Sequence, residues 1–198
     1  MSLKGSANLQ GQETIILEAA AKSIEESSLL DFTMSAISKE AGMSMGSIYK
    51  HIKSKEDVLV ALGFHSQVHF MELVNKVMAF PLPLNARFVA IQLIDSKYTS
   101  PYHFGDQLVT LLGNEAILKR ASSGWVEKYI ACDAAIDHLF QDQLSKASEE
   151  GELIIESEDR ELVLNEIITA TWALCVGYSQ VIQQRNVRSF TQNSTRLE

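Results

Sequence analysis

Side chains that could bind an anionic partner lie close together in this sequence, between Thr33 and Lys55. Lys50, His51, Lys53 and Lys55 fall within six consecutive positions that contain no acid. Cationic side chains neutralise phosphate groups, and phosphate neutralisation supplies most of the non-specific affinity of a protein for DNA. The chemistry that this stretch favours is therefore the binding of a polyanion. The alternative is an ordinary helical hairpin with a solvated lysine face.

Helix-capping signals divide the same stretch into three short helices. Thr33 and Ser44 stand where a hydroxyl can cap a helix N-terminus, and Gly42 stands where a left-handed residue is needed. Ser54 opens a third helix, with Asp57 at the capping-box position. The apolar residues at helical spacing in the first two helices are Ile37, Ala41, Ile48 and Ile52. Helix, glycine-containing turn and helix is the helix-turn-helix layout, in which the second helix lies in the major groove of DNA.

The stretch from Phe32 to Leu59 resembles the DNA-binding signature of the TetR family of transcriptional repressors. The residues that carry the resemblance are Thr33, Ile37, Ala41, Gly42, Ser44, Gly46, Ile48, Tyr49, His51 and Lys55. The resemblance implies that Tyr49 and Lys55 contact phosphates, and that residues around 44–50 read bases. The rest of the chain resembles the family in length, helical character and layout.

Within this stretch, Lys50 is the side chain best suited to read a guanine, because Arg, Asn and Gln are absent from residues 33–52. Met45 either touches a thymine methyl group or packs against the protein, and His51 either contacts phosphate or caps the helix end. The complete set of predicted DNA-binding residues is Thr33, Ser35, Ser44, Met45, Gly46, Ser47, Tyr49, Lys50, His51 and Lys55.

The composition favours an all-α protein. Apolar residues make up 46% of the 198 positions, only three residues are proline, and no segment alternates as an exposed strand does. We predict a disordered arm over residues 1–11, a helix-turn-helix domain over 12–63, and a C-terminal helical bundle over 64–198 for ligand binding and dimerisation. A long helix over about 54–80 joins the two domains. The net charge of −8 argues against nucleic acid when taken alone, but the distribution of charge matters more than its sum.

The bundle is predicted to contain one helix over 84–98, a long helix over 125–150, and a last helix that is capped by Ser157. This last helix is apolar on more than one face, so it either lies in the core or buries a second face against another chain. TetR-like proteins dimerise through their last two long helices, and this pattern fits that arrangement. The predicted dimer residues are Leu139, Trp172, Gly177 and Val181.

Aromatic residues with polar groups can line small-molecule cavities between helices, and they are also ordinary core residues. The family resemblance implies an inducer pocket in the C-terminal domain. The residues predicted to line it are Tyr98, Tyr102, His103, Phe104, Trp125, Tyr129, Trp172 and Tyr178.

Signals for catalysis and for metal binding are weak. The histidines form no triad arrangement with Ser, Cys and acids, and no glycine-rich phosphate loop is present. His65 and His69 have the spacing of two metal ligands on one helix, but the glutamate and the third ligand of a zinc site are missing, which favours a packed or surface pair. Cys132 and Cys175 have no metal-ligand partners at useful spacing, so we expect neither a zinc site nor a disulfide framework.

The sequence also argues against a membrane protein. Its longest uncharged apolar run, residues 167–182, has 16 residues, and about 20 are needed to span a bilayer. We expect no cofactor, no membrane segment and a cytoplasmic location, in agreement with the absence of a signal peptide.

We therefore predict a ligand-responsive bacterial transcriptional regulator, with repression favoured over activation. It would bind a palindromic operator as a homodimer and be released by a small apolar inducer. Two alternatives stay open: an interaction module that keeps the helix-turn-helix without binding an operator, and an enzyme that uses the C-terminal cavity.

Overall fold

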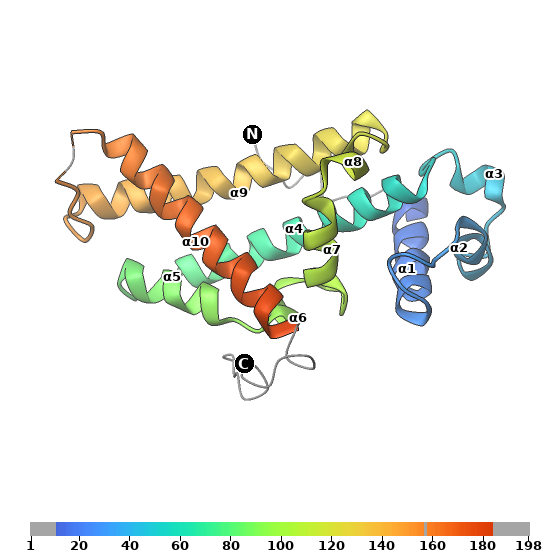
Figure 1. The fold of residues 1–198 in the computed structure, drawn as a ribbon, viewed down its shortest axis with the longest axis horizontal. Coiled ribbons are helices and arrows are strands. Elements are labelled where there is room, and N and C mark those ends of the chain that lie inside the picture. The colour runs from blue at the N-terminus through green and yellow to red at the C-terminus, as the bar shows by residue number, and fades with distance from the viewer. Residues whose placement is uncertain (1–10, 157, 184–198) are drawn as a thin grey trace. The chain divides into compact units, whose positions relative to one another are not determined.

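The computed structural model describes residues 11–156 and 158–183, and the regular elements in this part of the chain are helices (Figure 1). They are α1 (Gly11–Glu26), α2 (Met34–Glu40), α3 (Met45–Ile48), α4 (Lys55–Met78), α5 (Leu84–Leu93), α6 (Ser96–Thr99), α7 (Gly105–Leu112), α8 (Glu115–Leu118), α9 (Ser123–Glu149) and α10 (Arg160–Gln183). The all-α fold predicted from the sequence is confirmed. The predicted arm over residues 1–11 lies outside the described residues, except that Gly11 begins α1.

The chain forms two compact units. The first contains the residues up to His69 together with Ser100–Cys132, and the second contains Phe70–Thr99 and the residues from Asp133 onward. The units divide within α4 and within α9, whereas the sequence places a domain boundary near Gly63. Residues 100–132, which the sequence assigns to the C-terminal domain, belong with the N-terminal helices in the structure.

The core of the first unit follows the predicted helical periodicity. One stripe of α1 is buried, and its members are Ile16, Leu17, Ala20 and Ile24. The inward residues of the helix-turn-helix, Ile37, Ile48 and Ile52, are completely buried. In Figure 1 these helices lie together at the N-terminal end of α4. The apolar stripe of α1 thus supports the two helices that carry the predicted DNA-binding residues.

Helix α7 approaches α4 closely in the first unit, and a glycine permits this approach. Gly63 is buried within α4, and a Cβ atom at this position would lie 2.2 Å from Leu112 Cδ1 and 3.2 Å from Tyr129 Cε2. The shorter of these distances is one that real Cβ atoms essentially never show. The packing of α7 and α9 on α4 therefore depends on the missing side chain at Gly63.

The second unit is built around two apolar clusters. Val74, Val77 and Met78 of α4 pack with Ile91 of α5 in one of them. The residues that form the other are Leu84, Leu144, Ala147 and Leu164, from α5, α9 and α10. Phe88 packs against both clusters, so the two are continuous. This core combines the end of α4 with α5, α9 and α10.

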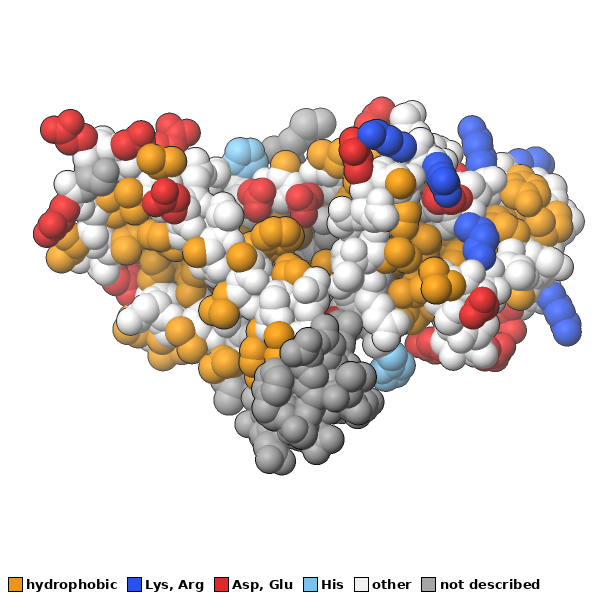
Figure 2. Space-filling model, in the orientation of Figure 1, with side chains coloured by type: hydrophobic (Ala, Val, Ile, Leu, Met, Phe, Trp, Pro, Cys, Tyr) orange, Lys and Arg blue, Asp and Glu red, His pale blue; other side chains and the backbone are white. Residues whose placement is uncertain are grey.

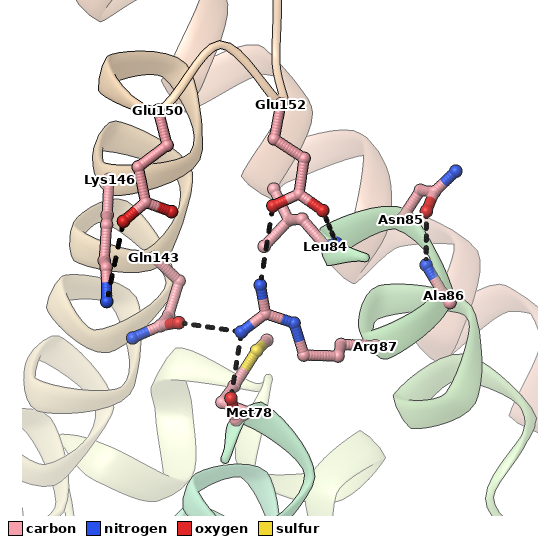
Figure 3. A network of polar contacts seen from close by, with 9 residues as sticks. All are labelled: Met78, Leu84, Asn85, Ala86, Arg87, Gln143, Lys146, Glu150 and Glu152. Carbon is pink, nitrogen blue, oxygen red and sulfur yellow. Dashed lines mark hydrogen bonds and ion pairs between the residues drawn. The ribbon is translucent and has the colours of Figure 1, made fainter. Parts of the chain in front are cut away.

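A largely buried arginine connects the elements of the second unit (Figure 3). Nη1 of Arg87 donates to the Met78 carbonyl at 2.9 Å and to Gln143 Oε1 at 3.5 Å, and Nη2 lies 3.7 Å from Glu152 Oε2. The other oxygen of Glu152 accepts the Leu84 N–H at the start of α5. The guanidinium group lies at the C-terminal end of α4, where the helix dipole favours a cation. It thereby ties α5 to the ends of α4 and α9.

Two helix boundaries differ from the sequence prediction. The single helix predicted over 84–98 is wrong, because Ile94 leaves the helical conformation (φ −60°, ψ 133°) and Asp95 starts a new helix by accepting the Lys97 N–H at 3.0 Å. At the start of α10, Asp159 Oδ1 accepts the Leu162 N–H at 3.1 Å and so caps the helix. The predicted cap Ser157 lies outside the described residues.

Candidate nucleic-acid interface

Side-chain hydrogen bonds cap the N-termini of α2 and α3 and so define the turn between them. Thr33 Oγ1 accepts the Ala36 N–H at 3.1 Å, and Ser44 Oγ accepts the Ser47 N–H at 3.2 Å. Between these caps, Gly42 has a φ of +63°, in the left-handed region that glycine enters without a Cβ penalty. The two predicted caps and the predicted left-handed glycine are confirmed.

One side of helix α3 is buried against the protein, and the other side is exposed to solvent. Ile48 is completely buried, whereas Tyr49 is 44% exposed and Lys50 is exposed. Of the other predicted DNA-binding residues on α2 and α3, Ser35, Ser44 and Gly46 are exposed, and Met45 and Ser47 are half-buried. This arrangement presents hydroxyl groups, one phenol and one ammonium group to solvent on α2, on α3 and on the residues that flank α3.

Lys55, predicted to contact phosphate, is held in place by the protein. Its Nζ donates to the Leu30 carbonyl at 3.0 Å and lies 4.5 Å from the centre of the Phe32 ring, a cation–π geometry. The charge therefore occupies a fixed position at the first residue of α4. A phosphate contact from this side chain would be made by an ammonium group that is already ordered.

The ring of His51 lies against α1. Its Nε2 is 2.9 Å from Gln12 Oε1, and its Nδ1 is 3.6 Å from Glu13 Oε1. The imidazole thus joins the segment after α3 to the first turn of α1. Whether it also contacts phosphate stays a prediction.

Asp57 holds the start of α4 and also binds a distant residue. Its side chain is completely buried. Oδ2 accepts the Lys53 N–H at 2.8 Å and the Ser122 hydroxyl at 2.7 Å, and Oδ1 accepts the Ser122 N–H at 2.5 Å. The Asp57 N–H donates to Ser54 Oγ at 3.0 Å, as the predicted cap requires. The sequence predicts this local cap, but nothing in it marks Ser122 as a partner.

Trp125 also contacts the segment between α3 and α4. Its indole Nε1 donates to the His51 carbonyl at 3.2 Å, and Lys128 Nζ lies 4.1 Å from the centre of its ring. The side chain is only 5% exposed. Trp125 thus lies beside the segment that joins α3 to α4, and its role in lining a ligand pocket stays a prediction.

The remaining aromatic residues predicted to line a pocket are divided between the two units. In the first unit, Tyr102 stacks on Phe104 with ring centres 5.2 Å apart, and its hydroxyl lies 2.6 Å from His65 Nδ1. Burial, together with the nearby charge of Glu18, raises the pKa of Tyr102 above its ordinary value. Tyr129 packs near Gly63 in the same unit, and His103 is exposed. The residues of the set that belong to the second unit are Tyr98, Trp172 and Tyr178.

The four predicted dimer residues have different surroundings. Leu139 packs against the cluster of Val74, Val77, Met78 and Ile91, so it contributes to the core of its own protomer. Trp172 is 64% exposed and Val181 is 40% exposed. A Cβ atom added to Gly177 would meet no heavy atom within 4 Å. Trp172, Gly177 and Val181 are therefore not covered by the protomer itself, although Trp172 and Val181, nine residues apart, lie on opposite sides of α10.

Charge is unevenly distributed over the chain. Residues 133–166 hold eleven acids and two bases, a net charge of −9, compared with −8 for the whole chain. Figure 2 shows basic side chains (blue) gathered on the first unit, and acidic side chains (red) at the turn between α9 and α10. Lys39, Lys50 and Lys53 are all exposed in the helix-turn-helix. The acidic excess thus belongs to the second unit, and the exposed lysines next to α3 are accessible to a polyanion.

The described residues contain neither a metal-ligand cluster nor a membrane-spanning helix. They contain no group of three or more His, Cys, Asp and Glu side chains that could hold a metal ion. No helix among them combines the length and the apolar character needed to cross a bilayer. Cys132 and Cys175 do not form a disulfide, and the thiol of Cys175 donates to Gln92 Oε1 at 2.8 Å.

Residues 16–62 match the model of the bacterial regulatory proteins of the tetR family. This segment contains most of α1, all of α2 and α3, and the start of α4, which together form the helix-turn-helix region described above. This segment of the chain is of the TetR type. The match indicates that this segment is the DNA-binding part of a bacterial regulatory protein. No curated protein matches the sequence significantly.

Solved structures of transcriptional regulators share this fold along most of the chain. FadR, a fatty acid degradation regulator from Bacillus halodurans, is 20% identical, with a TM-score of 0.58 over 90% of this chain and 93% of that protein. PfmR, a TetR-family regulator from Thermus thermophilus, is 18% identical, with a TM-score of 0.53 over 86% of this chain and 95% of that one.

FadR from Bacillus subtilis, solved in complex with stearoyl-CoA, is 20% identical, with a TM-score of 0.50 over 87% of this chain and 96% of that protein. At these identities the likeness concerns the fold. The TetR-type arrangement therefore extends beyond residues 16–62 into the C-terminal helices.

Proposed function

We propose that this protein is a ligand-responsive transcriptional repressor that binds a palindromic operator as a homodimer in the cytoplasm of a bacterium. Helix α3 is the recognition helix, and two copies of it lie in successive major grooves, about 34–36 Å apart. A small apolar inducer bound by the C-terminal helices shifts the population of conformers away from this spacing.

The observation that carries the proposal is the set of exposed residues in segment 44–50, namely Ser44, Gly46, Tyr49 and Lys50. The buried Ile48 fixes the inner side of α3, and the caps fix its start, so the exposed side chains occupy defined positions. Lys50 is the residue assigned to a base edge, and Tyr49 and Lys55 are assigned to phosphates. The exposed Trp172 and Val181 support self-association, because apolar residues at this exposure gain stability when another chain covers them.

The apolar character of the inducer is supported by the aromatic residues of the C-terminal half and by the fold, which accommodates stearoyl-CoA in the Bacillus subtilis protein. An apolar compound that releases the protein from its selected operator would identify the ligand class. A TetR-type protein that selects no operator from random duplexes would instead act as an interaction module.

The roles of the lysines are separated by selection from random DNA duplexes combined with titrations at several salt concentrations. Lys50→Ala should change the selected consensus at one base pair and cost about 1–3 kcal/mol per half-site. Lys55→Met keeps an apolar stem over Phe32 but removes the charge, so it should leave the consensus unchanged. It should lower the slope of log K against log salt by about 1 per protomer.

Lys76→Ala is the matched control, because it removes an exposed lysine from the same helix as Lys55, within the second unit. It should change neither the consensus nor the salt slope. If Lys50→Ala leaves every position of the consensus intact, the base-reading role of Lys50 is wrong. Specificity would then come from Met45, Ser44 and Ser47 together with DNA shape.

A further inference from the structure

The segment His51–Lys53, which we call the connector, joins the recognition helix α3 to α4, and both of its ends are held by residues of other elements. At one end, the His51 carbonyl accepts the indole N–H of Trp125 at 3.2 Å. At the other end, the Lys53 N–H donates to the buried carboxylate of Asp57 at 2.8 Å. Both hydrogen bonds are made by main-chain groups of the connector. Rotation of the connector's own side chains therefore cannot break them.

The start of α9 acts on both ends, directly through Trp125 at His51 and indirectly through Asp57 at Lys53. Ser122, the residue before α9, donates its N–H and its hydroxyl to Asp57. Its own carbonyl accepts the N–H groups of Trp125 and Val126, at 3.0 and 3.2 Å, so the helix fixes its position. The carboxylate of Asp57 thus lies at the N-terminus of a 27-residue helix, where the helix dipole stabilises an anion.

The connector is bonded in turn to α3. The N–H groups of His51 and Ile52 both donate to the carbonyl of Ile48, each at 2.9 Å. A displacement of the first turn of α9 would therefore move the connector, and the connector would move the last residue of α3. This route passes through short hydrogen bonds and does not require that α4 tilt.

We propose that Ser122 and Trp125 are positioning residues for the recognition helix, acting through the connector although they lie about 70 residues away in the sequence. The inference rests on the proposed DNA binding. Helix α9 continues without a break to Glu149, and its later residues Leu144 and Ala147 pack in the core of the second unit. A ligand that displaces α9 would therefore act on the connector, and so on α3, through Ser122 and Trp125.

The test is amide hydrogen exchange of the full-length protein, followed by measurement of operator affinity with a selected duplex. Trp125→Phe removes the indole donor but keeps an aromatic ring, and Ser122→Ala removes the hydroxyl. Each variant should speed exchange in residues 48–53 by about fivefold, the effect of one ordinary hydrogen bond. Each should weaken operator binding by a similar factor per protomer.

Two further variants separate a positioning role from general damage. Ser123→Ala changes the neighbouring exposed serine of the same turn and should leave exchange and affinity unchanged. Ser122→Thr keeps the hydroxyl donor and should restore both. Exchange in residues 16–24 of α1 should not change in any variant, because the loss is local to the connector.

Unchanged exchange in residues 48–53 in both Trp125→Phe and Ser122→Ala would overturn the inference. Faster exchange with unaltered operator affinity would also overturn it, because the connector would then not govern recognition. If the wild-type protein selects no duplex, the proposed function fails. The exchange data of the free protein still show in that case whether α9 holds the connector, so the two failures are distinguishable.

Discussion

Asp57→Asn is expected to destabilise the protein strongly, although the substitution replaces only one oxygen by an NH₂ group. The carboxylate is completely buried and accepts three hydrogen bonds, from the Lys53 N–H and from the N–H and hydroxyl of Ser122. An asparagine amide offers one acceptor oxygen, so its NH₂ group would face at least one N–H donor. Hydrogen bonds to a charged group contribute about 1.5–3 kcal/mol each, and an unsatisfied buried donor costs about 1–3 kcal/mol.

The loss of one such bond, with weakening of the other two, amounts to about 2–4 kcal/mol. For a chain of this size, 1 kcal/mol corresponds to about 2–4 °C in the melting temperature. We therefore expect Asp57→Asn to melt roughly 5–15 °C below the wild type. Circular dichroism during heating measures this, with all proteins at one concentration because association raises apparent stability.

Glu56→Gln is the matched control. It makes the same chemical change at the neighbouring residue, where Glu56 Oε1 lies 3.8 Å from Nη1 of the exposed Arg120. Surface ion pairs contribute about 0–1 kcal/mol, so this variant should melt within a few degrees of the wild type. Equal melting temperatures for Asp57→Asn and Glu56→Gln would refute the argument, since the buried hydrogen bonds would then contribute no more than a surface pair.

Three further perturbations test other parts of the structure. Gly63→Ala should destabilise by about 1–3 kcal/mol in urea unfolding, because its Cβ would lie 2.2 Å from Leu112 Cδ1; Gly124→Ala, in open space on α9, should be neutral or stabilising by up to about 1 kcal/mol. Gly177→Leu should raise the monomer fraction in sedimentation at micromolar concentration without unfolding the protomer, and an unaltered dimer would place the interface elsewhere. Because the pKa of Tyr102 is raised, the stability that its neutral form contributes is present below pH 10 and lost above it. Urea midpoints measured from about pH 8 to about pH 11.5 should therefore fall less steeply in Tyr102→Phe, and parallel curves would count against this effect.

The local architecture of the helix-turn-helix region can be predicted from residue types and their spacing. The caps at Thr33 and Ser44 and the left-handed Gly42 involve partners at most a few residues away, so residue type and spacing are sufficient to predict them. The buried positions of α1 follow from helical periodicity for the same reason. The family signature lies in this region, and the match to residues 16–62 confirms it.

The distant residues that contact these local elements could not be predicted in this way. Asp57 belongs to a cap that the sequence predicts, but its partner Ser122 lies 65 residues away, and Trp125 lies 74 residues from His51. Helical periodicity marks Trp125 as a residue to be buried, yet it carries no information on which helix will cover it. The break between α5 and α6 also escaped prediction, because an extended Ile94 breaks no rule of residue type.

The exposure of Trp172 is the same kind of result. An apolar helix with two hydrophobic faces predicts that one face is buried in the protomer and leaves open which one. The structure answers this through α5 and α10, where Gln92 binds the Thr171 carbonyl and the Cys175 thiol and turns that face inward. Burial depends on which surfaces come together when the chain folds, and that is a property of the packed helices, not of any single one.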